Sequence, residues 1–137
     1  TSGVILGGSD AVSDDVRDEL ASVMRDNGAT ASTPVERWSG ADRYATAVEV
    51  VNEGVARRWV DLDTVGIATG LNFPDALGGG GALCHYGSPL LLAKETVPSP
   101  VGTWMKANRL GIGRMDVFGG SDVVPDSVVV SLGKLLN

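Results

Sequence analysis

The sequence predicts an α/β protein with a mainly parallel sheet and helices on both faces of that sheet. Short apolar runs alternate along the chain with segments whose apolar residues recur at helical spacing. Four of these runs lead into a Gly-rich or polar loop directly before a helix start. This strand–loop–helix order is typical of parallel βαβ units, whose ligands gather at the carboxyl ends of the strands.

The first two strands are predicted at residues 4–6 and 35–38, with one helix between them. Ser13 is a residue type that caps helix N-termini, and the two aspartates after it suit the positive end of the helix dipole. Gly28 follows the last apolar residue at helical spacing, where glycine commonly ends a helix.

The middle of the chain adds a helix at about residues 41–59, a continuous apolar strand at 65–69, and a helix from Pro74 to about residue 86. The glycine run 78–81 lies inside this last helix. Each glycine there costs about 1 kcal/mol relative to alanine. We therefore expect either very close packing, on the sheet or on a neighbouring subunit, or a break in the helix.

The C-terminal part continues the alternation. It contains predicted strands at residues 89–93 and 115–118, and predicted helices at 99–111 and 125–136.

Composition restricts the possible functions of the chain. It has 137 residues, enough for a hydrophobic core without disulfides, and its only cysteine is Cys84, which we expect in the core. The formal net charge of −6 argues against nucleic-acid binding, because no basic stripe is present. No apolar stretch reaches the roughly 18 residues of a membrane span. Because Thr1 is not an initiator Met, we expect a processed or excised piece.

One sequence motif occurs twice, at residues 5–20 and again at 117–132. The identical pairs are Gly7/Gly119, Gly8/Gly120, Ser9/Ser121, Asp10/Asp122, Val12/Val124, Asp14/Asp126, Val16/Val128 and Leu20/Leu132. The repeat predicts that residues 1–36 are the tail of a preceding unit, either packed with the main module or paired with another chain, and that residues 37–137 are one full unit. Repeated modules usually bind or scaffold.

The sequence shows no catalytic constellation. Asp75 has no partnered base, His85 is the sole histidine, and no paired metal ligands occur. Asp75 is expected to accept hydrogen bonds from N–H groups at a helix start. The pair Gly119-Gly120 is either a tight turn with positive φ or an anion-binding loop, but no lysine follows as in a P-loop. We expect no cofactor and no metal.

Arg43 has two interpretations. Its guanidinium suits a phosphate or carboxylate ligand. Alternatively it forms a structural salt bridge, perhaps to Asp75, that ties two loops together.

Four segments in order resemble the cell-wall-binding repeat type 2 family. They are RWSGADRYATA at residues 37–47, ATGLNFPDAL at 68–77, PLLL at 89–92 and FGGSD at 118–122. Residues 3–20 resemble the closing part of a preceding copy. Together the segments are highly specific, although each alone is weak.

This resemblance implies a Rossmann- or toprim-like three-layer fold and a non-enzymatic module of exported Gram-positive proteins. The family attaches proteins to the cell wall through anionic secondary polymers of the teichoic-acid type. Its modules come in threes about a pseudo-threefold axis, so a chain with one full module is expected to form a homotrimer or to pack with neighbouring repeats. The resemblance implies a secreted, wall-associated protein.

The family's polymer-binding surface is associated with the Pro-apolar segment and its flanks. The candidate ligand-binding residues are Arg43, Asn72, Pro89, Leu90, Leu91, Leu92 and Lys94. The signature residues expected to hold the motif in place are Asp42, Tyr44, Thr46, Thr69, Gly70, Phe73, Asp75, Gly119 and Gly120. The acidic net charge does not suit an anionic ligand, so we expect Arg43, Lys94 and backbone N–H groups to line one groove.

Two other functions compete with wall binding. The first is an assembly module whose repeats associate and display a neighbouring domain, with no polymer ligand of their own. Trp38, Trp59 and Trp104 bear on it, because exposed tryptophans grouped together stack sugars or form interfaces, whereas single ones usually belong to cores. The second is a phosphate-handling enzyme on the same fold.

Overall fold

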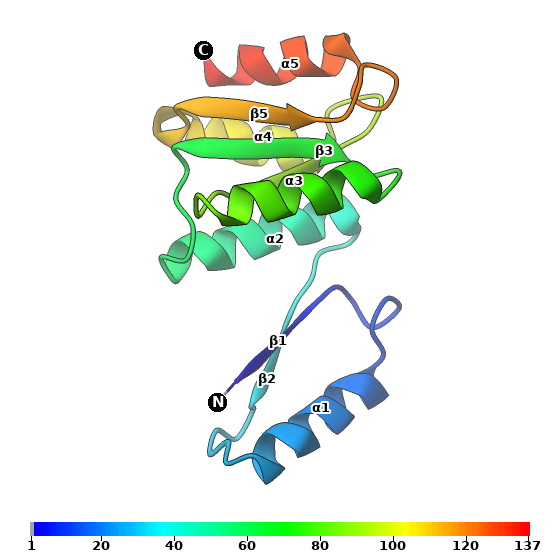
Figure 1. Ribbon diagram of the computed structural model, residues 1–137, viewed down its shortest axis with the longest axis vertical. Coiled ribbons are helices and arrows are strands. Elements are labelled where there is room, and N and C mark those ends of the chain that lie inside the picture. The colour runs from blue at the N-terminus through cyan, green and yellow to red at the C-terminus, as the bar shows by residue number, and fades with distance from the viewer. Residues whose placement is uncertain (1) are drawn as a thin grey trace.

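The computed structural model describes residues 2–137, and Figure 1 shows that they form two parts joined by one stretch of chain. The first part, which we call the N-terminal lobe, comprises residues 2–38. It contains β1 (Gly3–Leu6), α1 (Asp14–Asp26) and β2 (Val35–Trp38). β1 and β2 pair in parallel over their whole length, and α1 packs against both strands.

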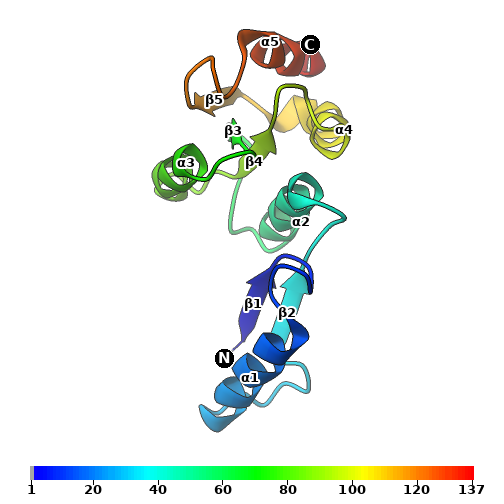
Figure 2. The same cartoon turned by 90° about the vertical axis from the view of Figure 1, so that its right-hand side faces the viewer.

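The second part, the main body, comprises residues 43–137. Its elements are α2 (Arg43–Ala56), β3 (Thr64–Thr69), α3 (Pro74–Cys84), β4 (Leu90–Ala93), α4 (Ser99–Asn108), the 3-10 turn η1 (Arg109–Gly111), β5 (Arg114–Phe118) and α5 (Asp126–Leu136). The strands form a parallel sheet in the order β4-β3-β5. In Figure 2 α3 lies on one side of this sheet, while α2, α4 and α5 lie on the other. The predicted three-layer α/β fold with parallel sheets is confirmed.

Each part has its own hydrophobic core. In the main body the strand residues Ile67 and Leu91 and the helix residues Met105 and Leu132 are completely buried. The lobe has a much smaller cluster around Ile5, and its helix α1 has one buried residue. Because burial of apolar area supplies most of the folding free energy, most of the stability resides in the main body.

The two parts are connected through β2. Arg57, at the C-cap of α2, forms an ion pair with Glu36. Its guanidinium carbon also lies 5.0 Å from the ring centre of Trp38 and 5.4 Å from that of Trp59. These contacts fasten β2 to the main body, whereas β1 and α1 make most of their contacts with each other and with β2.

Helix α3 continues through its glycine run without a break. Gly79 packs so closely on β5 that an added Cβ would lie 2.6 Å from Cγ of Phe118, whereas Gly78 and Gly81 face open space. Close packing on the sheet therefore explains Gly79 but not its exposed neighbours. Cys84 is exposed at the end of this helix, so the expectation of a core thiol was wrong.

The predicted elements match the observed ones to within a few residues. The structure departs from the prediction in sheet continuity, because the strands divide into a two-stranded and a three-stranded sheet. The last turn of the helix expected at residues 99–111 is a separate 3-10 turn.

Candidate functional site

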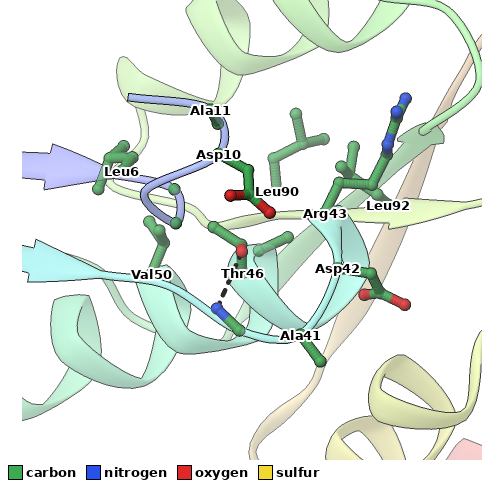
Figure 3. Close-up of a pocket in the computed structure, with 14 residues that line it drawn as sticks. Leu6, Asp10, Ala11, Ala41, Asp42, Arg43, Thr46, Val50, Leu90 and Leu92 are labelled. Carbon is green, nitrogen blue, oxygen red and sulfur yellow. Dashed lines mark hydrogen bonds between the residues drawn. The ribbon is translucent and has the colours of Figure 1, made fainter. Parts of the chain in front are cut away.

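A groove of about 620 Å³ lies where the N-terminal lobe meets the main body (Figure 3). Three segments form its walls: the glycine turn after β1, the start of α2, and the edge strand β4. The lining residues are Leu6, Gly7, Gly8, Asp10, Ala11, Gly40, Ala41, Asp42, Arg43, Thr46, Ala47, Val50, Leu90 and Leu92. This volume lies within the range of roughly 300–1,000 Å³ that is usual for small-ligand sites.

The start of α2 has a defined geometry. Asp42 is the N-cap, and its carboxylate accepts a hydrogen bond of 2.7 Å from the Ala45 N–H. The hydroxyl of Thr46 accepts a bond of 3.0 Å from the Gly40 N–H, the dashed line in Figure 3. These two bonds satisfy donors at a helix start and place Arg43, the first helical residue, at the groove.

Arg43 bridges two loops, but not by the salt bridge that was one of its two interpretations. Its Nη1 donates a hydrogen bond of 2.6 Å to the carbonyl of Gly70, and within residues 2–137 it makes no ion pair with Asp75. Arg43 as a whole is exposed, although its bond to Gly70 is part-buried. Since a guanidinium has five N–H donors, the bond to Gly70 orients the group and leaves donors for a ligand.

A second hollow of about 470 Å³ adjoins the groove. Its lining residues are Arg43, Thr69, Gly70, Leu71, Asn72, Phe73, Ala76 and Leu92. Arg43 and Leu92 line both spaces, so the groove and the hollow form one continuous candidate site across the end of β4. This site contains part of the central signature that was singled out in the sequence, namely residues 69–73 and Ala76.

The residues of the central signature mostly organise their own loop. The Thr69 hydroxyl is buried and accepts a hydrogen bond from the Leu71 N–H at 3.2 Å. The Asn72 side chain accepts one from the Phe73 N–H at 2.9 Å, and the Phe73 ring is exposed. Gly70 fits directly against Tyr44, because an added Cβ would lie 2.6 Å from Cε1 of that buried ring.

The Pro-apolar segment is divided between the groove and the core. Leu90 and Leu92 face the groove, whereas Leu91 is completely buried in the main core. Pro89 is buried at the opposite end of the strand, where its carbonyl accepts the Gly66 N–H. Successive side chains of a strand point to opposite faces, so only two of these four candidate residues reach the groove.

The groove contains charges of both signs. Lys94 follows β4, and its Nζ lies 5.7 Å from the ring centre of Tyr44, a distance that permits a cation–π contact. Lys94 lines neither the groove nor the second hollow, contrary to the expectation that it shares one groove with Arg43. Among the described residues that line the groove, Arg43 is the only cation, and the carboxylates of Asp10 and Asp42 lie on the lobe side and at the helix cap. The site is therefore suited to a ligand that presents an anionic group at the Arg43 end.

Three signature residues lie away from the groove, at the carboxyl end of β5. Asp75 is in the first turn of α3 and adjoins the turn at Gly119, which has φ +112°. Contrary to expectation, its carboxylate accepts no hydrogen bond from the described residues. Gly119 and Gly120 form a turn with a positive φ, as one of their two interpretations held.

Sequence reasoning did not predict the lobe side of the groove. Leu6, Asp10 and Ala11 belong to the segment assigned to a preceding repeat, and nothing in their pattern indicates a contact with β4. Of the tryptophans, Trp104 is buried and donates to Asn52, and Trp38 is buried under the exposed Trp59. They do not form a shared exposed platform.

The fold and this groove define a small α/β binding module. Residues 2–137 contain no group of three or more His, Cys, Asp or Glu side chains placed to hold a metal ion. The family model described as cell wall binding domain 2 matches residues 37–129, and the chain belongs to this family.

Two solved structures share the fold. Cwp6 from Clostridium difficile aligns with 98% of this chain at 22% identity and a TM-score of 0.79, and Cwp8 from the same organism aligns with 98% at 23% identity and a TM-score of 0.70. The chain spans 20% of the length of each. No curated protein matches it significantly. Within residues 2–137, no helix has the length and apolar character that crossing a membrane requires.

Proposed function

We propose that this chain is a non-catalytic module that attaches an exported protein to the cell wall by binding an anionic, teichoic-acid-like secondary polymer. The observation that carries this proposal is the continuous site between α2 and β4, where Arg43 lies beside the apolar side chains Leu90 and Leu92. Lys94 follows β4 outside the lining, with its Nζ near the Tyr44 ring. Membership of the cell wall binding domain 2 family supports a wall ligand.

The chemistry of the site fits a polymer of alternating phosphate and polyol or sugar units. The Arg43 guanidinium is held at one end by Gly70 and can present a pair of N–H groups to a phosphate. Leu92, in both spaces, offers apolar contact to the carbon skeleton between phosphates. Each phosphate-containing unit of the polymer contributes little binding free energy at one groove. High affinity would therefore come from several grooves that bind one polymer.

The family resemblance implies association of modules in threes, either as a homotrimer or with neighbouring repeats, and such an assembly would supply this multivalency. A trimer presents three grooves to one polymer. Light scattering on the purified chain measures its mass directly.

The test is sedimentation of the chain with purified Gram-positive cell walls, before and after acid extraction of secondary polymers. Binding is expected to fall to background after extraction. The double variant Arg43→Ala, Lys94→Ala is expected to lose at least about 10-fold in affinity, since each hydrogen bond to a charged group contributes about 1.5–3 kcal/mol.

The matched control is Arg109→Ala, Lys134→Ala, which removes the same charges from exposed positions away from the groove. It should bind like the unmodified chain. Unchanged binding by the Arg43, Lys94 variant, or binding that survives acid extraction, would contradict the proposal.

An assembly module remains the alternative function, and one observation favours it. β5 is an edge strand whose outer side pairs with no other strand among residues 2–137. A chain that forms a stable oligomer but never binds walls would support this alternative.

A further inference from the structure

We propose that the outer edge of β5, together with the turn at Gly119 and the carboxylate of Asp126, is the docking site for the β2 strand of a second copy of this repeat that follows in the same polypeptide. The N-terminal lobe is the template for this docking, because β1 and α1 contain the first copy of the repeated motif and β5 and α5 contain the second. The inference does not require a polymer ligand.

Within the lobe, β1 holds β2 by backbone hydrogen bonds at both ends. The Gly3 N–H donates to the Pro34 carbonyl at 2.8 Å, and the Gly7 N–H donates to the Trp38 carbonyl at 2.9 Å. The parallel register places Ile5 opposite Arg37 between them. Gly7 is buried by this pairing.

The Arg37 side chain of β2 binds both the glycine turn and the start of α1. Its Nη1 donates to the Gly7 carbonyl at 2.8 Å, and its Nη2 contacts the Asp14 carboxylate at 3.2 Å. The Arg37 side chain is only 17% exposed. An arginine that binds a carbonyl and a carboxylate together fixes geometry as well as charge.

The groups that bind β2 in the lobe recur in the C-terminal copy of the motif, where no strand is bound to them within residues 2–137. Gly119 corresponds to Gly7 and Asp126 to Asp14, and both residues are identical and exposed. Among residues 2–137 the structure gives no hydrogen-bond partner to the Gly119 N–H and no ion pair to Asp126. The positive φ of the turn also recurs, at +119° for Gly7 and +112° for Gly119.

β5 has the correct edge available for such a strand. Its inner edge pairs with β3, and Arg114 donates its N–H to Asp63 on that side. Donors alternate along a strand, so the N–H groups of Met115 and Val117 point outward, as do those of their counterparts Gly3 and Ile5 toward β2. The docked strand would place its Arg37 opposite Val117.

There is also space for the side chain that β2 buries. In the lobe Val35 packs with Ile5 and with Ala21 of α1. The counterpart of Ala21 is Gly133 of α5, where a built Cβ meets no atom within 4 Å. Val35 of a following copy would occupy this space.

The exposed side of β1 supports the same assignment. Leu6 is 54% exposed, whereas its counterpart Phe118 lies under Gly79 of α3. β1 is therefore a β5-type strand without its covering helix. That helix belongs, by the same logic, to the repeat before this one.

The repeat spacing defines the experiment. Asn137 corresponds to Arg25, so a tandem chain consists of residues 1–137 followed directly by a copy of residues 26–137. Amide hydrogen exchange is measured by NMR in the single chain and in the tandem. In the tandem, exchange of the Gly119 N–H is expected to slow by at least about 100-fold, as for a buried strand hydrogen bond.

Substitution Arg37→Ala in the appended copy should restore most of the fast exchange at Gly119. The matched control is the same substitution in the first copy, which should affect Gly7 and leave Gly119 protected. Gly119 exchange that stays as fast as in the single chain would overturn the inference. Failure of the appended copy to fold would also overturn it, because β5 and α5 must then be unable to replace β1 and α1.

Discussion

The two copies of the repeated sequence motif, β1–α1 and β5–α5, differ in the elements that they contact. Gly7 is buried and donates a hydrogen bond to β2, while the identical Gly119 is exposed and pairs with no strand among residues 2–137. Conversely, Phe118 is covered by α3, while its counterpart Leu6 is half exposed. The same motif thus forms a strand, a turn and a helix twice. Which of its faces is buried depends on the neighbouring elements.

The two helices show the same contrast. Val128 and Leu132 of α5 are 2% and 0% exposed, because α5 packs on α4 and on the core of the main body. Their identical counterparts in α1 are Val16, which is 49% exposed, and Leu20, which is half-buried. α1 packs mainly against the two-stranded sheet of the lobe.

The largest expected effect follows from this difference in burial. Leu132→Ala should lower the free energy of unfolding by about 2–5 kcal/mol, since it leaves a cavity in the main core. Leu20→Ala removes the same atoms from a half-buried site and should cost roughly half as much or less. Urea denaturation followed by circular dichroism measures both, and equal losses would contradict the assigned difference.

An intermediate effect is expected where α3 covers β5. Gly79→Ala brings a Cβ against the Phe118 ring, and overpacking of this kind costs about 1–3 kcal/mol. Gly78→Ala is the matched control one residue earlier, with open space around it, and should stabilise by up to about 1 kcal/mol. Thermal unfolding of the two variants should shift in opposite directions. A shift in the same direction would show that α3 does not lie on β5 as described.

The smallest effect is expected at Arg37. Arg37→Ala removes its bonds to Gly7 and Asp14 and should weaken the lobe by about 1–2 kcal/mol. Asp14 keeps a partner, since Arg17 contacts it at 3.0 Å. The hydrogen bond from Arg17 to Asp18, with the charge of Asp14, raises the pKa of Arg17. Faster amide exchange at Ile5 with unchanged exchange at Ile67 is the expected pattern; faster exchange at both would contradict a local role.

Most of the fold could be predicted from the sequence because periodicity and caps are local signals. Ser13 accepts the Val16 N–H as a cap should, and the strand at residues 35–38 has the predicted bounds. The partner of that strand could not be predicted. Its pairing with β1 instead of the main sheet depends on tertiary contacts, which periodicity and caps do not encode.

The candidate site was predicted less completely. Arg43 was expected to bind either a ligand or Asp75. Its hydrogen bond to the Gly70 carbonyl was not predicted, because every residue has a backbone carbonyl and residue identity does not show which one accepts. The division of the Pro-apolar segment was foreseeable, since alternation along a strand places Leu91 opposite Leu90 and Leu92. The contribution of Asp10 to the groove had no sequence signal.

The most direct test of the central comparison is amide hydrogen exchange of Gly7 and Gly119 in the single chain, measured in one NMR experiment. Both residues are followed by Gly-Ser-Asp and differ locally only in the preceding residues, Ile5-Leu6 and Val117-Phe118, so their intrinsic exchange rates are similar. We predict that Gly7 exchanges at least about 10-fold more slowly than Gly119, because within residues 2–137 Gly7 donates to a neighbouring strand and Gly119 does not. Equal rates at the two glycines would contradict it, since β5 would then not have an open edge.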